Sequence, residues 1–208
     1  LPTADFSVLD KCEGLHSIFT DNSTISTGNI ISGSYDLGDG SVSTSADEQH
    51  LYTESGVFNA TLQVVSDKGC EHSVNKNTTI FSIPESSFSA YEFCLETPTI
   101  FSDNSTVNNA TIISWDWNFG DNIGVTNSQN PTYMYSSAEL FDVSLTVVSD
   151  DGCTNTTTDA IVINSLPNVA FFVAESKICL DDELQFTDQS SVFNQSIVAW
   201  NWNFGDGN

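Results

Sequence analysis

Apolar and polar residues alternate with a period of two in several stretches of this chain. Residues 143–147 interleave Val and Leu with Ser and Thr, and residues 58–64 repeat the pattern with Phe, Ala, Leu and Val. Such alternation predicts β-strands with one face in a core and the other in solvent. Clusters of Gly, Asn, Asp and Ser, typical of turns, separate further short runs that we also expect to be strands, at residues 6–9, 17–21, 112–119 and 160–163. No stretch of ten or more residues has the periodicity of an amphipathic helix.

A unit of about 82 residues recurs along the chain. The segment Trp-Asn-Phe-Gly-Asp-Asn at residues 117–122 returns as Trp-Asn-Phe-Gly-Asp-Gly at 202–207, and in weaker form as Tyr-Asp-Leu-Gly-Asp-Gly at 35–40. Repetition at a nearly fixed period indicates a tandem array of small domains. We therefore divide the chain into a first unit (1–82), a second unit (83–165) and a third segment (166–208), which we expect to be the N-terminal half of a third unit.

The short strands and junctions predict the fold class. Six or seven short strands in so small a unit indicate an immunoglobulin-like β-sandwich. The dipeptides Ile83-Pro84 and Leu166-Pro167 leave almost no linker between units, and proline restricts bending. We expect an all-β protein with tandem immunoglobulin-like sandwiches in an elongated row. We also expect this sequence to be a segment of a longer secreted protein.

The cysteines suggest how such small units are stabilised. Cys12 and Cys70 lie 58 residues apart, and Cys94 and Cys153 lie 59 apart, so each pair brackets most of its unit. We predict a disulfide within each unit, Cys12–Cys70 and Cys94–Cys153, worth roughly 4 kcal/mol by loop-closure entropy. Disulfides are typical of oxidising compartments, so the protein is expected to be extracellular or on the cell surface. Reduced, buried thiols are the alternative.

The charge excludes several classes of partner. The chain has 28 acidic residues against four lysines and no arginine, and its formal net charge is −24. Nucleic-acid binding needs cationic contacts to phosphate, and anionic membrane surfaces repel such a chain. We therefore expect no nucleic-acid partner. No apolar stretch is long enough to insert into a membrane within this segment.

A second pattern follows the Gly-Asp segment in the first two units. The second unit has Tyr-Met-Tyr at 133–135 and Phe-Asp-Val-Ser-Leu-Thr-Val at 141–147; the first has His-Leu-Tyr at 50–52 and Gly-Val-Phe-Asn-Ala-Thr-Leu-Gln-Val at 56–64. With the Trp-x-Phe-Gly-Asp-Gly segment, this pattern resembles the PKD (polycystic kidney disease) domain along the whole chain. Three residues depart from the family pattern: Tyr35 stands for Trp, and Asn122 and Glu139 stand for Gly.

The resemblance implies an immunoglobulin-like β-sandwich of secreted and cell-surface proteins, used mostly as a spacer or interaction module. The acidic, cysteine-paired, Ser/Thr/Asn-rich composition is also similar to that of very long surface adhesins and filaments of bacteria.

The Gly-Asp segment carries the residues that we expect to be structural. Alternation places its aromatic side chains on one strand face, which predicts core positions for Tyr35, Trp117, Phe119, Trp202 and Phe204. Asp and Gly after a strand supply turn chemistry, which predicts turns at Gly38, Asp39, Gly120, Asp121, Gly205 and Asp206.

Candidate ligand sites are few. No cofactor is predicted, and no metal site is predicted, because Cys-x-x-Cys and EF-hand spacings are absent and the three histidines are scattered. Calcium held by turn carboxylates, such as those of Asp36, Asp39, Asp116 and Asp121, stays an alternative. Trp115 and Trp200, nearer the strand start, are candidates for stacking on a sugar or on the neighbouring unit.

Sequence motifs of catalysis are absent. The chain has no Gly-x-Ser-x-Gly, no His-Glu-x-x-His and no phosphate-binding glycine loop, so we predict that it is not an enzyme. We predict a structural spacer of a long extracellular adhesin or surface filament, which presents distal elements for adhesion. Its partners are then neighbouring repeats of the same chain and, in a filament or bundle, other copies of the chain. The alternative is a ligand- or polysaccharide-binding accessory module of a secreted hydrolase.

Overall fold

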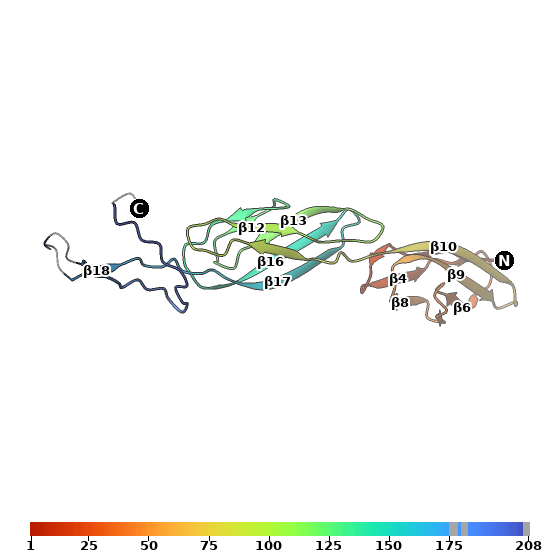
Figure 1. The fold of residues 1–208 in the computed structure, drawn as a ribbon. Helices are drawn as coiled ribbons and strands as arrows, with labels where there is room; N and C mark the ends of the chain where they lie inside the picture. Colours follow the sequence, from red (N-terminus) through yellow and green to blue (C-terminus); the bar gives the residue numbers. More distant parts are fainter. Residues whose placement is uncertain (175–178, 180–182, 206–208) are drawn as a thin grey trace.

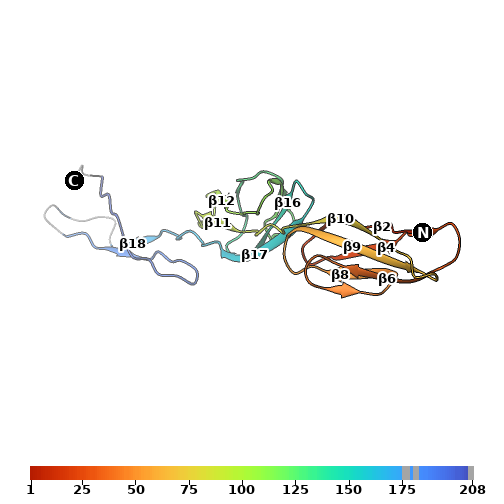
Figure 2. The same ribbon diagram turned by 90° about the vertical axis from the view of Figure 1, so that its right-hand side faces the viewer.

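The protein is described from a computed structural model, which covers residues 1–174, 179 and 183–205. In these ranges the regular structure is strand, without helix, so they also contain no helix that could cross a membrane. Figure 1 shows two β-sandwich bodies in a row, followed by a third segment that carries β18 (Phe171–Val173). The turned view in Figure 2 shows the same elongated arrangement. The predicted all-β fold class with tandem sandwiches is confirmed.

The first unit consists of two main sheets and one short strand pair. The larger sheet has the order β3-β10-β9-β6-β7, the smaller has the order β2-β4-β8, and β1 pairs with β5. The strands are β1 (Pro2–Thr3), β2 (Phe6–Ser7), β3 (Lys11–Cys12), β4 (His16–Asp21), β5 (Thr24–Ile25), β6 (Ile30–Asp36), β7 (Val42–Ser43), β8 (Asp47–Leu51), β9 (Gly56–Ser66) and β10 (Glu71–Phe81).

The second unit repeats this plan. One sheet has the order β14-β13-β16-β17 and the other β11-β12-β15. The parallel bridge between Cys94 and Asn164 corresponds to the parallel pairing of β3 with the end of β10 in the first unit. The strands are β11 (Phe88–Tyr91), β12 (Thr99–Asp103), β13 (Ile112–Asn118), β14 (Val125–Thr126), β15 (Thr132–Tyr133), β16 (Leu140–Ser149) and β17 (Thr154–Val162).

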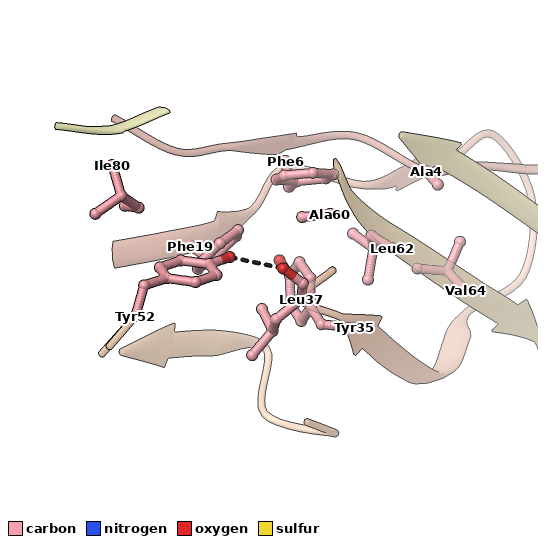
Figure 3. Close-up of a cluster of buried hydrophobic side chains, with 10 residues drawn as sticks. All are labelled: Ala4, Phe6, Phe19, Tyr35, Leu37, Tyr52, Ala60, Leu62, Val64 and Ile80. Carbon is pink, nitrogen blue, oxygen red and sulfur yellow. Dashed lines mark hydrogen bonds between the residues drawn. The ribbon is translucent and has the colours of Figure 1, made fainter. Parts of the chain in front are cut away.

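Each of these two units has its own hydrophobic core between its sheets. In the first unit, Phe6 and Phe19 from the smaller sheet pack with Tyr35 and Leu62 from the larger one, as Figure 3 shows. In the second unit, the alternate residues of the predicted strand 143–147 are buried in β16, and so are Phe141 and Ser149. Side chains from both sheets thus meet face to face, which is the packing of a β-sandwich.

The third segment pairs β18 antiparallel with β19 (Phe186–Asp188). Phe171, Phe186, Trp202 and Phe204 form an aromatic group on one face of this hairpin. A groove of about 360 Å³ lies over that group. In the second unit, the equivalent aromatic residues lie in a core to which β16 adds Val143, Leu145 and Val147.

Candidate functional site

The Gly-Asp turn of each unit lies against a neighbouring strand. Gly38 and Gly120 have φ angles of 82° and 81°, the left-handed region that favours glycine. A Cβ atom would lie 2.8 Å from the carbonyl oxygen of Asn59 at the first position, and 2.5 Å from that of Asp142 at the second. Both the backbone conformation and the close approach of a strand therefore require glycine here.

A matched pair of glycine substitutions separates these two requirements. Gly152 has a φ of 80°, but a Cβ atom added there would meet no other atom within 4 Å, so Gly152→Ala should cost only the left-handed backbone penalty, about 1–2 kcal/mol. Gly120→Ala adds a clash with backbone, typically about 1–3 kcal/mol more. Hydrogen exchange of the β16 amides measures both costs. Equal costs for the two variants would contradict the role of close approach.

The turn aspartate contacts a side chain two residues before a buried tyrosine in each unit. Asp39 Oδ2 lies 2.6 Å from His50 Nε2, and in the second unit the Asp121 carboxylate accepts a hydrogen bond from the Tyr133 hydroxyl. His50 and Tyr133 stand at equivalent positions. An imidazole in one unit and a phenol in the other make the same contact. The contact therefore holds the turn in place and does not depend on the chemistry of one residue type.

The pKa values of these groups agree with that role. Burial acts to raise the pKa of Asp121, but hydrogen bonds from Tyr133 and the backbone of Gly124 outweigh it and lower the pKa. The pKa of Asp39 is lowered in the same way, by His50 and Ser41 against the effect of burial. The hydrogen bond to Asp121, with burial, raises the pKa of Tyr133 to about 12. The tyrosine is therefore a neutral donor to a charged carboxylate at neutral pH.

A second tyrosine ties each turn to the core. The hydroxyl of Tyr52 donates to the carbonyl oxygen of Leu37 at 2.8 Å (Figure 3), and that of Tyr135 donates to the carbonyl oxygen of Phe119 at 3.1 Å. Burial, with the charge of Asp39, raises the pKa of Tyr52 to about 12. A buried neutral hydroxyl thus satisfies a buried carbonyl in both units.

The aromatic residues of the Gly-Asp segment differ in burial between the units and the third segment. The exposed fractions are 1% for Tyr35, 0% for Trp117, 2% for Phe119 and 57% for Phe204, and Trp202 is half-buried. Gly205 has the left-handed φ of the other turns, 77°, and Asp206 lies outside the described residues. The aromatic residues thus lie in closed cores in the first two units and line an open groove in the third segment.

Trp115 and Trp200 each make one equivalent polar contact. The indole Nε1 of Trp115 donates to Asp103 Oδ2 at 2.7 Å, and that of Trp200 donates to Asp188 Oδ2 at 2.7 Å. Burial acts to raise the pKa of Asp103, but hydrogen bonds from Ser105, Gln129 and the indole outweigh it and lower the pKa. The contact fixes the Trp115 ring at the edge of the core.

The disulfide prediction is wrong in its pairing. The structure joins Cys12 of the first unit to Cys153 of the second, 141 residues apart, with the Cα atoms at 5.7 Å. Cys70 and Cys94 form no disulfide. The bond therefore links neighbouring units, whereas the predicted bonds Cys12–Cys70 and Cys94–Cys153 would each have lain inside one unit.

The length of β10 explains why a bond within the first unit is impossible. Cys12 pairs with Phe81 at one end of this strand, and Cys70 directly precedes Glu71 at the other end. Eleven residues of strand at about 3.3 Å each place the two cysteines roughly 35 Å apart. A disulfide needs Cα atoms within about 7 Å. The nearly equal cysteine spacing in the two units was the only signal in the sequence, and this spacing is also compatible with pairing across the junction.

Further contacts hold the junction between the units. Ser82, which is buried, donates its hydroxyl to the carbonyl oxygen of Asn108 at 2.5 Å. Asn155 Nδ2 donates to the carbonyl oxygen of Pro84 at 2.8 Å. The segment between the units is therefore fixed by hydrogen bonds on the side of the second unit, in addition to the disulfide.

No metal site stands out in the part of the chain that the structure describes: it contains no group of three or more His, Cys, Asp or Glu side chains placed to hold an ion. The turn carboxylates accept backbone N–H groups instead, as Asp36 does from Gly38 and Asp39 from Ser41.

Comparison with known families gives a match over most of the chain. The sequence model of the PKD domain matches residues 2–81 and 86–163. A microbial collagenase of Vibrio alginolyticus is 43% identical over 72 residues, which are 34% of this chain and 9% of the relative. The pre-pro-metalloprotease PrtV of Vibrio cholerae is 31% identical over 160 residues, which are 76% of this chain and 17% of the relative. This chain thus spans only a small part of either relative.

Solved structures include similar single domains. The PKD1 domain of Vibrio anguillarum Epp has 29% identity and a TM-score of 0.38, and the match covers 40% of this chain and 95% of that domain. The PKD1 domain of Vibrio cholerae PrtV has 26% identity and a TM-score of 0.37, and the match covers 39% of this chain and 96% of that domain.

Proposed function

Because this chain belongs to the PKD domain family, we propose that it is a stiff, non-catalytic spacer of an extracellular protein, such as an adhesin or surface filament, that presents distal elements. The observation that carries the proposal is the covalent bond across the junction, Cys12–Cys153. A hinge between two domains needs a flexible connection with few crossing contacts. Here a disulfide and a proline segment fixed by hydrogen bonds join the two units next to each other.

The two connections restrict bending in a simple way. The chain passes from Phe81 to Glu85 through Pro84, while the disulfide leaves the first unit at Cys12, whose backbone neighbour is Phe81. Two separate attachments between the same two bodies oppose rotation about either one. The units thus keep a fixed relative orientation, as a spacer requires.

Charge and redox state support an extracellular place of work. A disulfide persists in oxidising compartments. The net charge of −24 makes separate copies of the chain repel each other and keeps the protein soluble. The proposed partners are therefore the neighbouring repeats of the same chain, with lateral contacts to other copies only where cations screen the charge.

Small-angle X-ray scattering tests the spacer proposal. We expect the scattering of the oxidised chain to be that of a single elongated particle, and the double variant Cys12→Ser/Cys153→Ser to give a broader range of dimensions. The single variant Cys70→Ser is the matched control, because Cys70 is outside the disulfide. An oxidised chain that already samples many bend angles, or is compact, would refute the proposal.

The relatives favour a second candidate function. Proteins described as a microbial collagenase and a metalloprotease carry similar domains, so this chain is alternatively an accessory module that binds the substrate of a secreted hydrolase. Co-sedimentation with insoluble collagen fibrils distinguishes the two. Saturable binding that survives physiological salt would favour the accessory role, and its absence would favour the spacer.

A further inference from the structure

We propose that Cys94 and Cys70 are linkage sites that form the same inter-unit disulfide with the next and the preceding PKD unit in a row. The partner in each case is a cysteine thiol of another unit of this kind. The proposal concerns covalent assembly and stands whether or not the chain serves as a spacer. It follows from three repeated arrangements around the bonded and unbonded cysteines.

The first arrangement is the loop that carries Cys12 and Cys94. After Cys12, the N–H of Glu13 donates to the carbonyl oxygen of Phe81 at 2.8 Å; after Cys94, the N–H of Leu95 donates to that of Asn164 at 2.9 Å. The cysteine carbonyl closes the following turn at 3.1 Å in both units. Cys94, which is exposed, is therefore held at the end of the second unit as Cys12 is held at the end of the first.

The second arrangement is the turn that carries Cys70 and Cys153. The N–H of Cys70 donates to Ser66 Oγ at 3.1 Å, and the N–H of Cys153 donates to Ser149 Oγ at 3.1 Å. In both turns the serine N–H donates to the cysteine carbonyl oxygen at 2.9 Å. Cys70 is half-buried beside Leu1, at the end of the first unit where a preceding unit would dock. The backbone of Cys70 is thus held as that of the bonded Cys153 is held.

The third arrangement is the junction itself, which occurs twice. The cleft between the first two units is lined on one side by Ser55, Gly56, Val57 and Ile80 and on the other by Asn108 and Asn109. The cleft between the second unit and the third segment is lined by residues at the equivalent positions, Ala138, Glu139, Leu140, Ile163, Phe193 and Asn194. Asn109 and Asn194 even share a positive φ, 55° and 53°.

The repeated junction determines where a following cysteine lies. In the first junction, the docked unit carries Asp151 into the cleft and Cys153 onto Cys12. The third segment faces the second unit across a cleft lined by the equivalent residues, while the Ser165 hydroxyl, equivalent to that of Ser82, has no hydrogen-bond partner among the described residues. A complete unit docked in that orientation therefore brings its own Gly-Cys turn onto Cys94. By the same geometry, a unit that precedes Leu1 presents its Cys94 equivalent to Cys70.

The bond forms by thiol–disulfide exchange with a disulfide oxidant such as oxidised glutathione. The Cys94 thiolate attacks one glutathione sulfur, forms a mixed disulfide and releases the other glutathione as a thiolate. The partner thiolate then attacks the Cys94 sulfur and releases the second glutathione. The two protons of the protein thiols pass to the two glutathione thiolates, and two electrons reduce the oxidant.

Such bonds would overlap along the row. The loop closed by Cys12–Cys153 contains both Cys70 and Cys94 in its sequence. Each unit is then bonded to both neighbours, one bond at each end. In such an array, the loops closed by successive disulfides overlap in the sequence. Every unit that unfolds must therefore displace a cysteine that is bonded to a neighbouring unit.

The test extends the intact chain by one unit. A copy of residues 83–165, with its own Cys153→Ser change, is placed before Leu1; the joint Ser165–Leu1 reproduces the natural step from Ser165 to Leu166. After refolding in a glutathione redox buffer, we expect peptide mapping to find the added copy's Cys94 bonded to Cys70. Alkylation of Cys70, present in the unextended chain, should be lost. The added copy carrying Cys94→Ser is the matched control and should restore alkylation.

A second arm distinguishes the source of the partner thiol. The unextended chain is oxidised at high concentration in the same buffer, and Cys70–Cys94 bonds between separate copies are sought. Bonds in either arm support the linkage sites, and the arm that yields them identifies the source as a neighbouring repeat or a second copy. If Cys70 and Cys94 stay open to alkylation in both arms while Cys12–Cys153 is present, the proposal is overturned.

Discussion

Stretching the oxidised chain between its two ends should leave residues 13–152 unextended, because the Cys12–Cys153 bond carries the force past them. A pulling force follows the shortest covalent path, which runs from Leu1 to Cys12, across the disulfide and on from Cys153. Most residues of both sandwiches lie outside that path, but β1, β2, β3 and β17 lie on it. We therefore expect single-molecule force spectroscopy of the oxidised chain to show no lengthening from residues 13–152.

Reduction should release a large length under the same load. The two cysteines are 141 residues apart, which corresponds to about 490 Å of extended chain at about 3.5 Å per residue. Force–extension traces before and after addition of a reductant measure this gain in length. The distance that the folded residues already span is subtracted from it. Cys12→Ser should behave as the reduced protein, and Cys70→Ser as the oxidised one. A full-length extension of the oxidised chain would show that the bond does not join the two units.

The same bond should also stabilise each unit without load. If one unit unfolds while the other stays folded, the disulfide closes a loop of about 70 residues, which is worth roughly 4 kcal/mol by the chain-entropy model. That is a large part of the total stability of a small domain, about 5–15 kcal/mol. The bond thus acts on both units at once.

Trp117→Ala should destabilise the second unit by about 3–5 kcal/mol and leave the first unit unchanged. The Trp117 side chain is fully buried and packs against Phe88 and Phe101, with ring centroids at 5.1 and 5.4 Å. Its Nε1 donates to the carbonyl oxygen of Ser128 at 2.9 Å, so truncation also leaves that acceptor without its partner. Hydrogen exchange of β16 against β9 measures the effect unit by unit.

Trp115→Ala is the matched control on the same strand. Trp115 is only half-buried and its main polar partner, Asp103, keeps bonds from Ser105 and Gln129. We expect a clearly smaller loss than for Trp117→Ala. Equal losses, or faster exchange in β9, would mean that the two sandwiches do not have separate cores.

Local patterns in the sequence were sufficient to predict the strands that have one face in a core. The period of two in residues 58–64 and 143–147 corresponds to β9 and β16, because one face of each strand is buried and the other is not. The strand β10 was missed. Its sequence, Glu-His-Ser-Val-Asn-Lys-Asn-Thr-Thr-Ile-Phe, is largely polar, and the strand is held by main-chain pairing with β9 along ten residue pairs.

The sequence alone determined the repeat, the sandwich class and the aromatic positions of the first two cores, since these depend on residue type and on local spacing. The tertiary structure decided the cysteine partners and the contacts that His50 and Tyr133, already equivalent in the sequence, make with the turn aspartates. Cysteine pairing depends on which end of a long strand each sulfur occupies and on which unit stacks there, and neither is encoded in the spacing along the chain.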